Sequence, residues 1–429
     1  MVVFNTTVFQ IPRGTRDHTP EQMEKRQALE EKIRATFKTY GYREIQTPTF
    51  ETLELFTAKS GDAILDEIYE FTDKSGRKLA LRPELTAPVI RCYIDKLQME
   101  PKPLKLFYFG NCYRYDRPQK GRYREFLQAG CEIIGPDTVE AYAELIALAY
   151  TIFRTIGLKN INLQIGNLSI IESLFKKLGL SKEHQQYVLP LMDKAKYDEV
   201  SIYLSEINIP QGEIQQFLNI VQTTDIYDIQ KYLKDDTSIA SELANLENIF
   251  ELLRNGFSIK KIQLNLGIVR GLDYYKGVVF EIDAPVLGAE KQLCGGGAYQ
   301  LVQLFGGNDV PTAGFAIGFD RTLLALESEG YAFDRQKIEA FVIPINNDII
   351  QKAIVIAQQL RNQGVSTDID LLRRGIGKAL KYANTKNAKN VILVGPKELE
   401  GDAVILRDMK TGKQEIVKLK NLISRVKQS

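Results

Sequence analysis

The chain has 429 residues, which exceeds what one ordinary hydrophobic core holds, so two or three domains are expected. Hydrophobic residues make up 44% and charged residues 26%, as in globular proteins that fold in water. The formal net charge is only +2 and the pI is about 8.1, which excludes a uniformly basic nucleic-acid binder but permits a local basic patch.

Cysteine and histidine usage points away from metal or disulfide chemistry. The four cysteines show neither CxxC pairs nor the dense spacing of a disulfide framework. We therefore expect buried free thiols in a reducing cytosol, and no metal site built by the protein. The two histidines, His18 and His184, are too few for a His-rich metal site, and neither lies in a motif for nucleophilic catalysis.

No targeting or membrane segment is expected. Residues 1–10 lack the basic start and long apolar run of a signal peptide. The most apolar helical segment, residues 141–158, contains charged side chains and is too short to span a bilayer. The sequence therefore predicts a cytoplasmic protein that does not bind a membrane.

The first predicted element is a helix over residues 19–40. Thr19 and Gln22 form a capping box, and Pro20 occupies the first helical position, where a missing N–H breaks no helical hydrogen bond. Apolar side chains recur every three or four residues and give the helix one buried face, at Leu29, Ile33, Phe37 and Tyr40.

Three strand-like segments follow this helix. Gly41 ends the helix, residues 42–46 alternate like a strand, and Pro48 prevents the strand from pairing further. Residues 106–116 and 123–134 form two longer strand-like runs, and the segment that connects them contains Pro and Gly. The pattern therefore predicts a long hairpin.

The middle of the chain changes character twice. Residues 168–257 have Leu, Ile and polar residues at helical spacing without a glycine-rich motif, which predicts an inserted helical module. Strand patterns return at residues 261–268 and 278–282. Two glycine-rich segments follow, at residues 294–297, interpreted as a loop, and at residues 314–320, which lead into a further helix.

A domain boundary is expected at residues 330–337. Beyond it, strand-like and helical segments alternate, which favours a small α/β domain with a mixed sheet. The predicted strands are residues 340–345, 366–370 and 391–395, the predicted helices are residues 349–362 and 377–384, and a hairpin ends the chain.

Five basic residues lie within residues 113–126. In a strand, the even spacing of Arg114, Arg122 and Arg124 would place these side chains on shared faces of a sheet. Arginine binds carboxylate and phosphate bidentately, so the cluster suits an anionic ligand such as a triphosphate. Interleaved aromatic residues would supply a stacking face for a base. The alternative is a solvated hairpin with surface ion pairs.

The segment 270–275 (RGLDYY) combines an arginine, a carboxylate and two tyrosines. Arg270 has no histidine nearby in the sequence, so it would act as a fixed positive charge that stabilises a transition state. The alternative is a buried pair of Arg270 and Asp273 that braces a strand. The glycines at residues 295–297 and 314–318 allow close backbone approach to a ligand, but they form neither a P-loop nor a Rossmann motif.

Taken in order, these segments resemble the signature motifs of class II aminoacyl-tRNA synthetases. The helix and strand that end at Pro48 resemble motif 1, which builds the dimer interface in that class. Residues 113–126 resemble motif 2, and residues 314–321 resemble motif 3. RGLDYY and residues 130–132 (GCE) match signatures of the histidine-specific family. The resemblance covers nearly the whole chain, including a C-terminal segment that is similar to the anticodon-binding domain of these enzymes.

This resemblance implies both a fold and an activity. The fold is a class II catalytic domain with an antiparallel sheet at residues 1–330, a helical insertion at about 168–257, and a mixed α/β anticodon-binding domain at residues 337–429. The activity is that of a histidine–tRNA ligase, which uses ATP with Mg²⁺ to form histidyl-adenylate and transfers histidine to tRNA(His). The resemblance also implies a homodimer.

The resemblance carries residue roles for histidine onto this sequence. The residues implied to hold the α-ammonium group are Glu84, Thr86 and Gln128. Those implied to read the imidazole ring are Glu132 and Tyr275, with Tyr274 lining the same pocket. Arg114 and Arg270 would grip the histidine carboxylate and the α-phosphate of ATP during in-line attack, so positioning and electrostatics would supply the catalysis.

The resemblance likewise implies roles for ATP and tRNA. Phe126 would stack on adenine, and Arg321 would cover its other face and contact the γ-phosphate. The residues implied to contact the rest of ATP are Arg114, Asp116, Arg122 and Arg124, with Asp116 where many members have Glu. Arg117 and Gln119 would meet the acceptor end of the tRNA.

The chain departs from the family pattern in one segment. Members usually have GGGRYD where this chain has GGGAYQ, so Ala298 and Gln300 replace an arginine and an aspartate. If the missing pair braces its segment, another interaction must replace it; if the pair helps to bind substrate, affinity is lower here. Leu127 is also less polar than the usual residue.

Three alternatives stand beside this interpretation. A non-catalytic paralogue could serve as a histidine-sensing regulatory subunit of ATP-phosphoribosyltransferase, but such paralogues generally lack the anticodon domain and the arginine of RGLDYY. A class II synthetase for threonine or proline would not need Glu132 and Tyr275, which suit an imidazole. A general RNA-binding module would not need the arginines that suit ATP.

Overall fold

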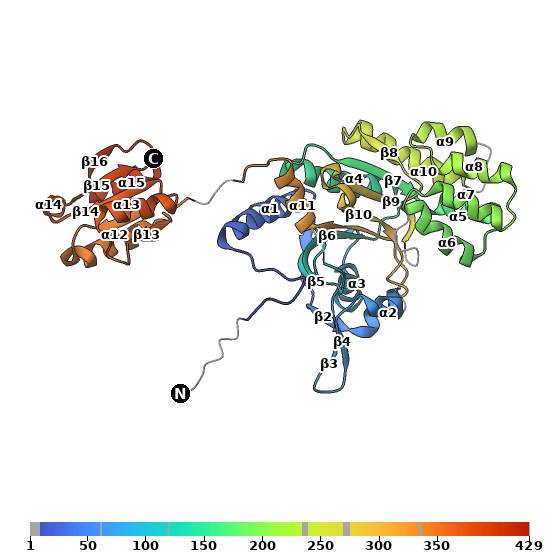
Figure 1. The fold of residues 1–429 in the computed structure, drawn as a ribbon, viewed down its shortest axis with the longest axis horizontal. Helices are drawn as coiled ribbons and strands as arrows, with labels where there is room; N and C mark the ends of the chain where they lie inside the picture. The colour runs from blue at the N-terminus through green and yellow to red at the C-terminus, as the bar shows by residue number, and fades with distance from the viewer. Residues whose placement is uncertain are drawn as a thin grey trace. The chain divides into compact units, whose positions relative to one another are not determined.

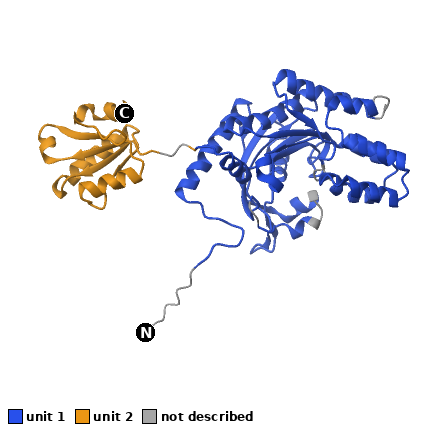
Figure 2. Cartoon of the chain, turned by 45° about the horizontal axis from the view of Figure 1, so that its top comes forward, with its two compact units in different colours: residues 1–332 blue, residues 333–429 orange. Residues whose placement is uncertain are grey.

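A computed structural model describes residues 9–60, 62–118, 121–233, 239–268, 275–333 and 337–428. The chain divides into two compact units, Met1–Ala332 and Phe333–Ser429, which are coloured separately in Figure 2. Figure 1 labels the helices and strands of both units in chain order.

A mostly antiparallel sheet forms the centre of the first unit. Within the described residues it has eight strands in the order β1-β5-β6-β11-β10-β9-β7-β8, and only its two end pairs, β1 with β5 and β7 with β8, are parallel. This arrangement confirms the predicted antiparallel catalytic-domain sheet. The strands are β1 (Arg43–Glu44), β5 (Leu104–Tyr113), β6 (Glu125–Ile134), β7 (Asn162–Asn167), β8 (Ile262–Leu264), β9 (Tyr275–Asp283), β10 (Gln292–Tyr299) and β11 (Thr312–Gly318).

Helix α1 (Pro20–Thr39) packs on one face of this sheet. Its predicted capping box is present, because Thr19 accepts from the backbone of Gln22 and the Gln22 side chain accepts from the backbone of Thr19. Phe37 on its buried face stacks on Phe107 of β5 with a ring-centroid distance of 4.9 Å. Helix α4 (Val139–Ile156) contacts α1 and the same sheet, so these helices leave the opposite face to other groups.

The strand after α1 is shorter than predicted. Strand β1 covers two residues where the sequence pattern predicted residues 42–46. Its pairing with β5 continues only to the backbone bond from Ile45 to Phe107 O (2.9 Å). The chain is then held by buried Arg82, which donates to the backbone oxygens of Thr47 (2.9 Å) and Pro48 (3.1 Å) instead of extending the sheet.

The predicted helical insertion is confirmed as a set of helices. They gather beside β7, β8 and β9 in Figure 1, where the chain runs from green to yellow, and α5 contacts β9. In the described part of this segment the helices are α5 (Leu168–Lys177), α6 (Lys182–Asp193), α7 (Tyr197–Glu206), α8 (Gln211–Val221), α9 (Ile226–Leu233), α10 (Ala240–Glu251) and the π-helical turn η3 (Leu252–Gly256).

The glycine-rich segment is a strand, and its interpretation as a loop was wrong. Glycines 295–297 lie in the middle of β10, paired with β9 on one side and β11 on the other. A Cβ at Gly296 would lie 2.2 Å from Gly314 O, and a Cβ at Gly297 would lie 2.5 Å from Val278 O. Glycine is therefore required by close neighbours within the sheet and not by a turn.

The remaining elements of the first unit lie around this sheet. A small antiparallel sheet, not predicted from the sequence, has the order β2-β4-β3 in the described residues. The elements are β2 (Phe50–Thr52), α2 (Leu53–Ser60), η1 (Asp62–Asp66), β3 (Glu70–Thr72), β4 (Lys78–Leu81), α3 (Thr86–Cys92), η2 (Tyr93–Leu97), η4 (Pro285–Glu290) and α11 (Phe319–Ser328).

The second unit confirms the predicted mixed sheet. Its strand order is β13-β12-β14-β15-β16 within the described residues, with β12 parallel to β13 and β14 and the last two pairings antiparallel. The elements are β12 (Ala340–Pro344), η5 (Asn347–Ile349), α12 (Ile350–Asn362), β13 (Thr367–Ile369), α13 (Ile376–Thr385), β14 (Asn390–Val394), α14 (Pro396–Glu400), β15 (Ala403–Asp408), β16 (Gln414–Lys418) and α15 (Leu419–Gln428).

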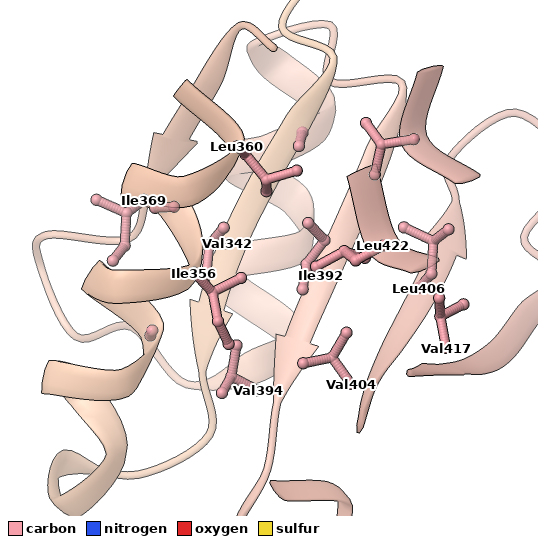
Figure 3. Packing of buried hydrophobic residues seen from close by; sticks show 14 of the residues in the cluster. Val342, Ile356, Leu360, Ile369, Ile392, Val394, Val404, Leu406, Val417 and Leu422 are labelled. Carbon is pink, nitrogen blue, oxygen red and sulfur yellow. The ribbon is translucent and has the colours of Figure 1, made fainter. Parts of the chain in front are cut away.

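Helix α15 corrects the expectation that a hairpin ends this unit. Leu422 and Val426 lie one helical turn apart and are both buried, so the helix packs an apolar face against the sheet. Figure 3 shows Leu422 beside Ile392, Leu406 and Val417 in this core. The highly charged sequence of α15 concealed the short apolar stripe.

No helix in the described ranges of the chain has the length and apolar character needed to cross a membrane.

The core of the second unit gives a stability prediction. Ile392 is fully buried, so Ile392→Ala should lower the free energy of unfolding by about 2–5 kcal/mol. The matched control is Ile354→Ala on α12, where the side chain is 48% exposed and the loss should stay within about 0.5 kcal/mol. Urea unfolding with hydrogen exchange read at β14 measures both variants. Equal losses would contradict the packing shown.

Candidate active site

The face of the large sheet opposite α1 carries a buried group of polar side chains around Glu132. Glu132 of β6 pairs with Gly314 of β11, and Gly314 pairs with Gly297 of β10. Neither glycine has a side chain, so the Glu132 carboxylate lies across β11. A Cβ at Gly314 would lie only 1.7 Å from Glu132 Oε2, which makes glycine obligatory there.

Two buried tyrosines hold the Glu132 carboxylate. Tyr108 donates to Oε1 at 3.0 Å, and Tyr299 donates to Oε2 at 2.6 Å. Burial raises the pKa of Glu132 to about 8, although hydrogen bonds from Tyr299, Thr86 and Tyr108 partly oppose the shift. Gly130 belongs to this arrangement, since a Cβ there would lie 2.6 Å from the Tyr108 hydroxyl oxygen.

Tyr299 is a site residue that sequence reasoning missed. In the sequence it follows the glycine-rich segment, within GGGAYQ. In the structure it is the last residue of β10 and donates directly to Glu132. Tyr275, which was predicted for this pocket, packs edge-to-face on Tyr299 with a ring-centroid distance of 6.3 Å. The glycines before Tyr299 could have suggested a residue that approaches a ligand, but strand pairing alone reveals its partner.

Three further predicted residues lie at or beside the start of α3. Glu84 caps this helix, accepting from the backbone N–H groups of Thr86 (2.6 Å) and Ala87 (3.0 Å). Thr86 also hydrogen-bonds toward Glu132, which connects the helix start to the buried carboxylate. Gln128, two residues before Gly130 on β6, accepts from the backbone N–H of Leu85 at 3.1 Å. The structure therefore brings Glu84, Thr86, Gln128 and Glu132 together.

The basic residues of motif 2 lie in the connection between β5 and β6. The expectation that Arg114, Arg122 and Arg124 share strand faces was wrong, because β5 ends at Tyr113 and β6 begins at Glu125. Pairing continues for one step, as Arg114 N donates to Arg124 O at 2.9 Å. The Arg114 side chain turns toward α3 and donates from Nε to Pro83 O at 3.0 Å.

Arg114 links the buried carboxylate region to the motif 2 aromatic residue. Its guanidinium carbon lies 5.5 Å from the ring centroid of Phe126, which is partly exposed. Asp116 accepts through its backbone oxygen from Arg124 Nε at 3.2 Å, and Arg117 is exposed. A partly exposed ring beside a guanidinium can stack on a planar, electron-rich group such as a nucleobase.

Arg321 of α11 faces motif 2 from the other side. It donates to Gly121 O (3.0 Å) and Gln292 O (3.2 Å), and its Nη2 pairs with Glu290 Oε2 at 2.6 Å. Arg122 approaches the same Glu290 oxygen at 4.0 Å. Burial lowers the pKa of Arg321, and the positive charges of Arg122 and Arg114 add to this effect. Two arginines at one carboxylate, with Arg114 close enough to affect Arg321, form a site that suits an anion with several charges.

Several predicted residues lie outside the described part of the chain. They are Gln119 in motif 2, and Arg270 and Tyr274 in the RGLDYY segment. Tyr275 is the first described residue after that segment and begins β9.

Ala298 and Gln300 line a cavity that Tyr299, the donor to Glu132, also lines. The cavity has a volume of about 570 Å³ and lies between the ends of β9 and β10, the start of α4, and α10. Four carboxylates and Lys276 contribute to its wall, the carboxylates being Asp137, Glu140, Glu242 and Asp309. The small side chain of Ala298 therefore lies in an acidic wall.

No cluster of three or more His, Cys, Asp or Glu side chains that could hold a metal ion occurs among the residues that the structure describes. The four cysteines are free, and Cys112, Cys131 and Cys294 are buried.

Known proteins resemble the chain over nearly its whole length. A family model described as Histidyl-tRNA synthetase matches residues 14–322, and one described as Anticodon binding domain matches residues 339–429. A histidine–tRNA ligase of Methanosarcina acetivorans is 43% identical over 423 residues, covering 97% of this chain and 98% of the relative.

Solved structures share the fold. An apo histidyl-tRNA synthetase of S. aureus superposes with a TM-score of 0.75 at 30% identity, covering 98% of this chain and 100% of that one. A Bacillus halodurans protein is described as an ATP phosphoribosyltransferase regulatory subunit/histidyl-tRNA synthetase. It superposes with a TM-score of 0.78 at 24% identity, and the match covers 90% of this chain and 98% of the Bacillus halodurans chain. That identity shows the fold alone.

The antiparallel sheet, the motif 2 connection and the arginine of α11 together define a class II aminoacyl-tRNA synthetase. The extent of the family match and of the sequence identity then narrows the class: the chain belongs to the histidyl-tRNA synthetase family.

The buried Glu132 gives a pH prediction. Its raised pKa means that, between about 4.5 and about 8, the folded chain retains a proton that the unfolded chain releases. The wild type should therefore lose stability relative to Glu132→Gln as pH rises through this window. Melting temperatures of the ligand-free proteins at about pH 5 and about pH 8 measure the difference. The control is Glu415→Gln, which removes an exposed carboxylate. A constant difference between wild type and Glu132→Gln would contradict burial of an ionisable Glu132.

Proposed function

We propose that this chain activates L-histidine with ATP and transfers the histidyl group to the 3′ end of tRNA(His). The observation that carries the proposal is the buried Glu132 carboxylate between two tyrosines, connected through Thr86 and Arg114 to a cluster of arginines. A carboxylate suits an imidazole N–H, and arginines suit a triphosphate. Matches to histidine–tRNA ligases along nearly the full chain support the same activity.

Histidine specificity would come from buried polar groups. Glu132 and Tyr275 read the imidazole in this proposal, Tyr274 lines the pocket, and Tyr299 fixes the Glu132 carboxylate. The α-ammonium group is held by Glu84, Thr86 and Gln128. An amino acid without ring nitrogens could not add the hydrogen bond that an imidazole N–H makes to the buried Glu132, and a missing bond at a buried polar group costs more than the loss of a surface contact.

Adenylate formation would depend on fixed positive charge. Arg114 and Arg270 align the histidine carboxylate with the α-phosphate and stabilise the charge that develops during in-line attack. The bond from Arg114 Nε to Pro83 O supports this role, since it orients the guanidinium beside the segment that holds Glu84. The carboxylate oxygen bonds to the α-phosphorus as the bond to pyrophosphate breaks, and no covalent enzyme intermediate forms.

ATP would lie between motif 2 and α11. Phe126 stacks on adenine and Arg321 covers its other face, while Arg122, Arg124 and Asp116 complete the contacts. Arg321 and Arg122 both face Glu290, so the phosphates compete with this carboxylate for the same cations. Mg²⁺ would neutralise charge on the triphosphate. Because the described residues offer no three-ligand cluster, its coordination would come mainly from phosphates and water.

The tRNA would contact both parts of the chain. Arg117 and Gln119, in the motif 2 connection, meet the acceptor end, and the exposure of Arg117 supports this role. Residues 1–330 form the catalytic domain with an insertion at about 168–257, and residues 337–429 bind the anticodon. The anticodon-domain match at residues 339–429 supports the second assignment.

A homodimer in the cytoplasm completes the proposal. Exposed aromatic side chains on the small sheet suit a surface that a second copy covers, since Phe50 and Phe71 pack edge-to-face at 6.0 Å and are 51% and 42% exposed. This sheet begins directly after the motif 1 segment. The four free cysteines suit a reducing compartment.

The regulatory alternative is disfavoured. The chain carries an anticodon-domain match and the arginine of RGLDYY, and its relatives at about 40% identity are histidine–tRNA ligases. In a synthetase for threonine or proline, the substrate would offer no imidazole N–H to the buried Glu132. A general RNA-binding module would not explain two arginines that share the Glu290 carboxylate.

The first test of the proposal is amino-acid-dependent pyrophosphate exchange. Purified chain should exchange labelled pyrophosphate into ATP when histidine is supplied, because its imidazole N–H can bond to the buried Glu132. Threonine and proline serve as controls and should give background exchange. Exchange with either of them, or none with histidine, would overturn the assignment.

The second test separates catalysis from tRNA contact. Arg270→Ala should lower histidine-dependent exchange by roughly 10²–10³, the usual effect of removing one preorganised transition-state donor. The matched variant Arg117→Ala should leave exchange within a few-fold but lower the rate of tRNA charging. Arg270→Ala activity within a few-fold of wild type would show that Arg270 is structural.

A further inference from the structure

The segment before α1 lies against motif 2. We call residues 9–18 the N-terminal strap. Arg124 N donates to Gly14 O at 2.9 Å, so the strap is bonded to the backbone of the motif 2 connection. Gly14 has φ +88°, and a Cβ there would lie 2.7 Å from the Arg124 side chain. The strap can therefore approach Arg124 this closely only with glycine at position 14.

Arg16 connects the strap to two separate motifs. Its guanidinium carbon lies 3.3 Å from the ring centroid of Tyr123 in motif 2, and its Nη2 pairs with Asp320 Oδ1 of α11 at 2.8 Å. The contact with Tyr123 is a close stack, and the second contact is a charge-assisted pair with a buried acceptor. The Arg16 side chain thus contacts both motif 2, which carries Arg114 and Arg122, and α11, which carries Arg321.

Asp320 also contacts α1 and β6. Arg26 of α1 pairs with the same oxygen at 2.5 Å, and Asp320 Oδ2 accepts from Leu127 N of β6 at 3.1 Å. Its pKa is lowered by Arg26 and Arg16, whose charges outweigh the opposing effect of burial. The next residue in the chain is Arg321. Asp320 therefore fixes the start of α11, and with it Arg321, relative to the strand that carries Phe126.

We propose that Arg16 is a positioning residue for the ATP site: by stacking on Tyr123 and pairing with Asp320, it sets the spacing between motif 2 and Arg321. This inference rests on the proposed function of that site. Among the described residues, the Arg16 side chain contacts Tyr123 and Asp320, and neither residue belongs to the group around Glu132 and Tyr299. Its removal should therefore weaken ATP binding selectively and leave histidine binding intact.

The test compares three variants in histidine-dependent pyrophosphate exchange. Arg16→Ala should raise KM for ATP by roughly 10-fold, with KM for histidine within about twofold. Arg16→Lys retains the charge that faces Asp320 but loses the planar face over Tyr123, so it should restore part of the ATP affinity. The matched control is Arg13→Ala, an exposed arginine of the same strap, which should leave both KM values unchanged.

Hydrogen exchange gives a second measurement that does not depend on catalysis. Arg16→Ala should speed exchange in peptides that contain Arg124 and Leu127, whose backbone N–H groups bond to the strap and to Asp320. Arg13→Ala should not. Unchanged KM for ATP together with unchanged exchange in these peptides would overturn the proposal. So would an equal rise of both KM values with a large loss of melting temperature, because that result would make Arg16 a general stability residue.

The outcomes separate this inference from the proposed function. If the wild type shows no histidine-dependent exchange, the proposed function fails. ATP titration by calorimetry, with the same three variants and the same peptides, then judges Arg16 alone. Selective weakening of ATP binding in Arg16→Ala would support the inference in either case, and equal ATP affinity in all variants would refute it.

Discussion

The burial of one carboxylate constrains the centre of the catalytic unit. Glu132 can lie across the sheet only because its strand neighbour Gly314 has no side chain. Its position in turn requires Tyr108 and Tyr299 as donors, because an unpaired buried carboxylate is very costly. A pocket with a fixed acceptor at its floor discriminates by chemistry more than by size, which is what recognition of an imidazole against apolar side chains requires.

A second buried acid plays the corresponding part for the arginine cluster. Asp320 joins the N-terminal strap, α1, β6 and α11, which are far apart in sequence. The roles proposed for Arg321 and Arg114 require that their spacing is fixed before the ligand arrives, since preorganisation is the source of electrostatic catalysis. Both halves of the site thus rely on a buried acid held by neutral or cationic donors, and Arg114 with Thr86 connects the two halves.

Local sequence signals predicted the elements whose stabilisation is local. The capping box and apolar face of α1, and the helices of the insertion, depend on residues within a few positions of one another. The sequence patterns gave wrong predictions where a residue's structural partner lies far away in the sequence. The glycines of β10 looked like a loop because the reason for them, backbone atoms of β9 and β11, is invisible in the sequence, and α15 hid its apolar stripe among charges.

The sequence alone determined which chemical groups the site has: its motif residues named the arginines, the aromatic ring and Glu132, through the resemblance of RGLDYY, GCE and the motif 2 segment to one family. Only the tertiary structure decided what those groups do to one another. It supplied Tyr299 as a donor to Glu132, Glu290 as the carboxylate between Arg122 and Arg321, and Arg16 as the connection between two motifs. The reason is that burial and pairing depend on strand register and helix packing, which bring together residues that are far apart in the sequence.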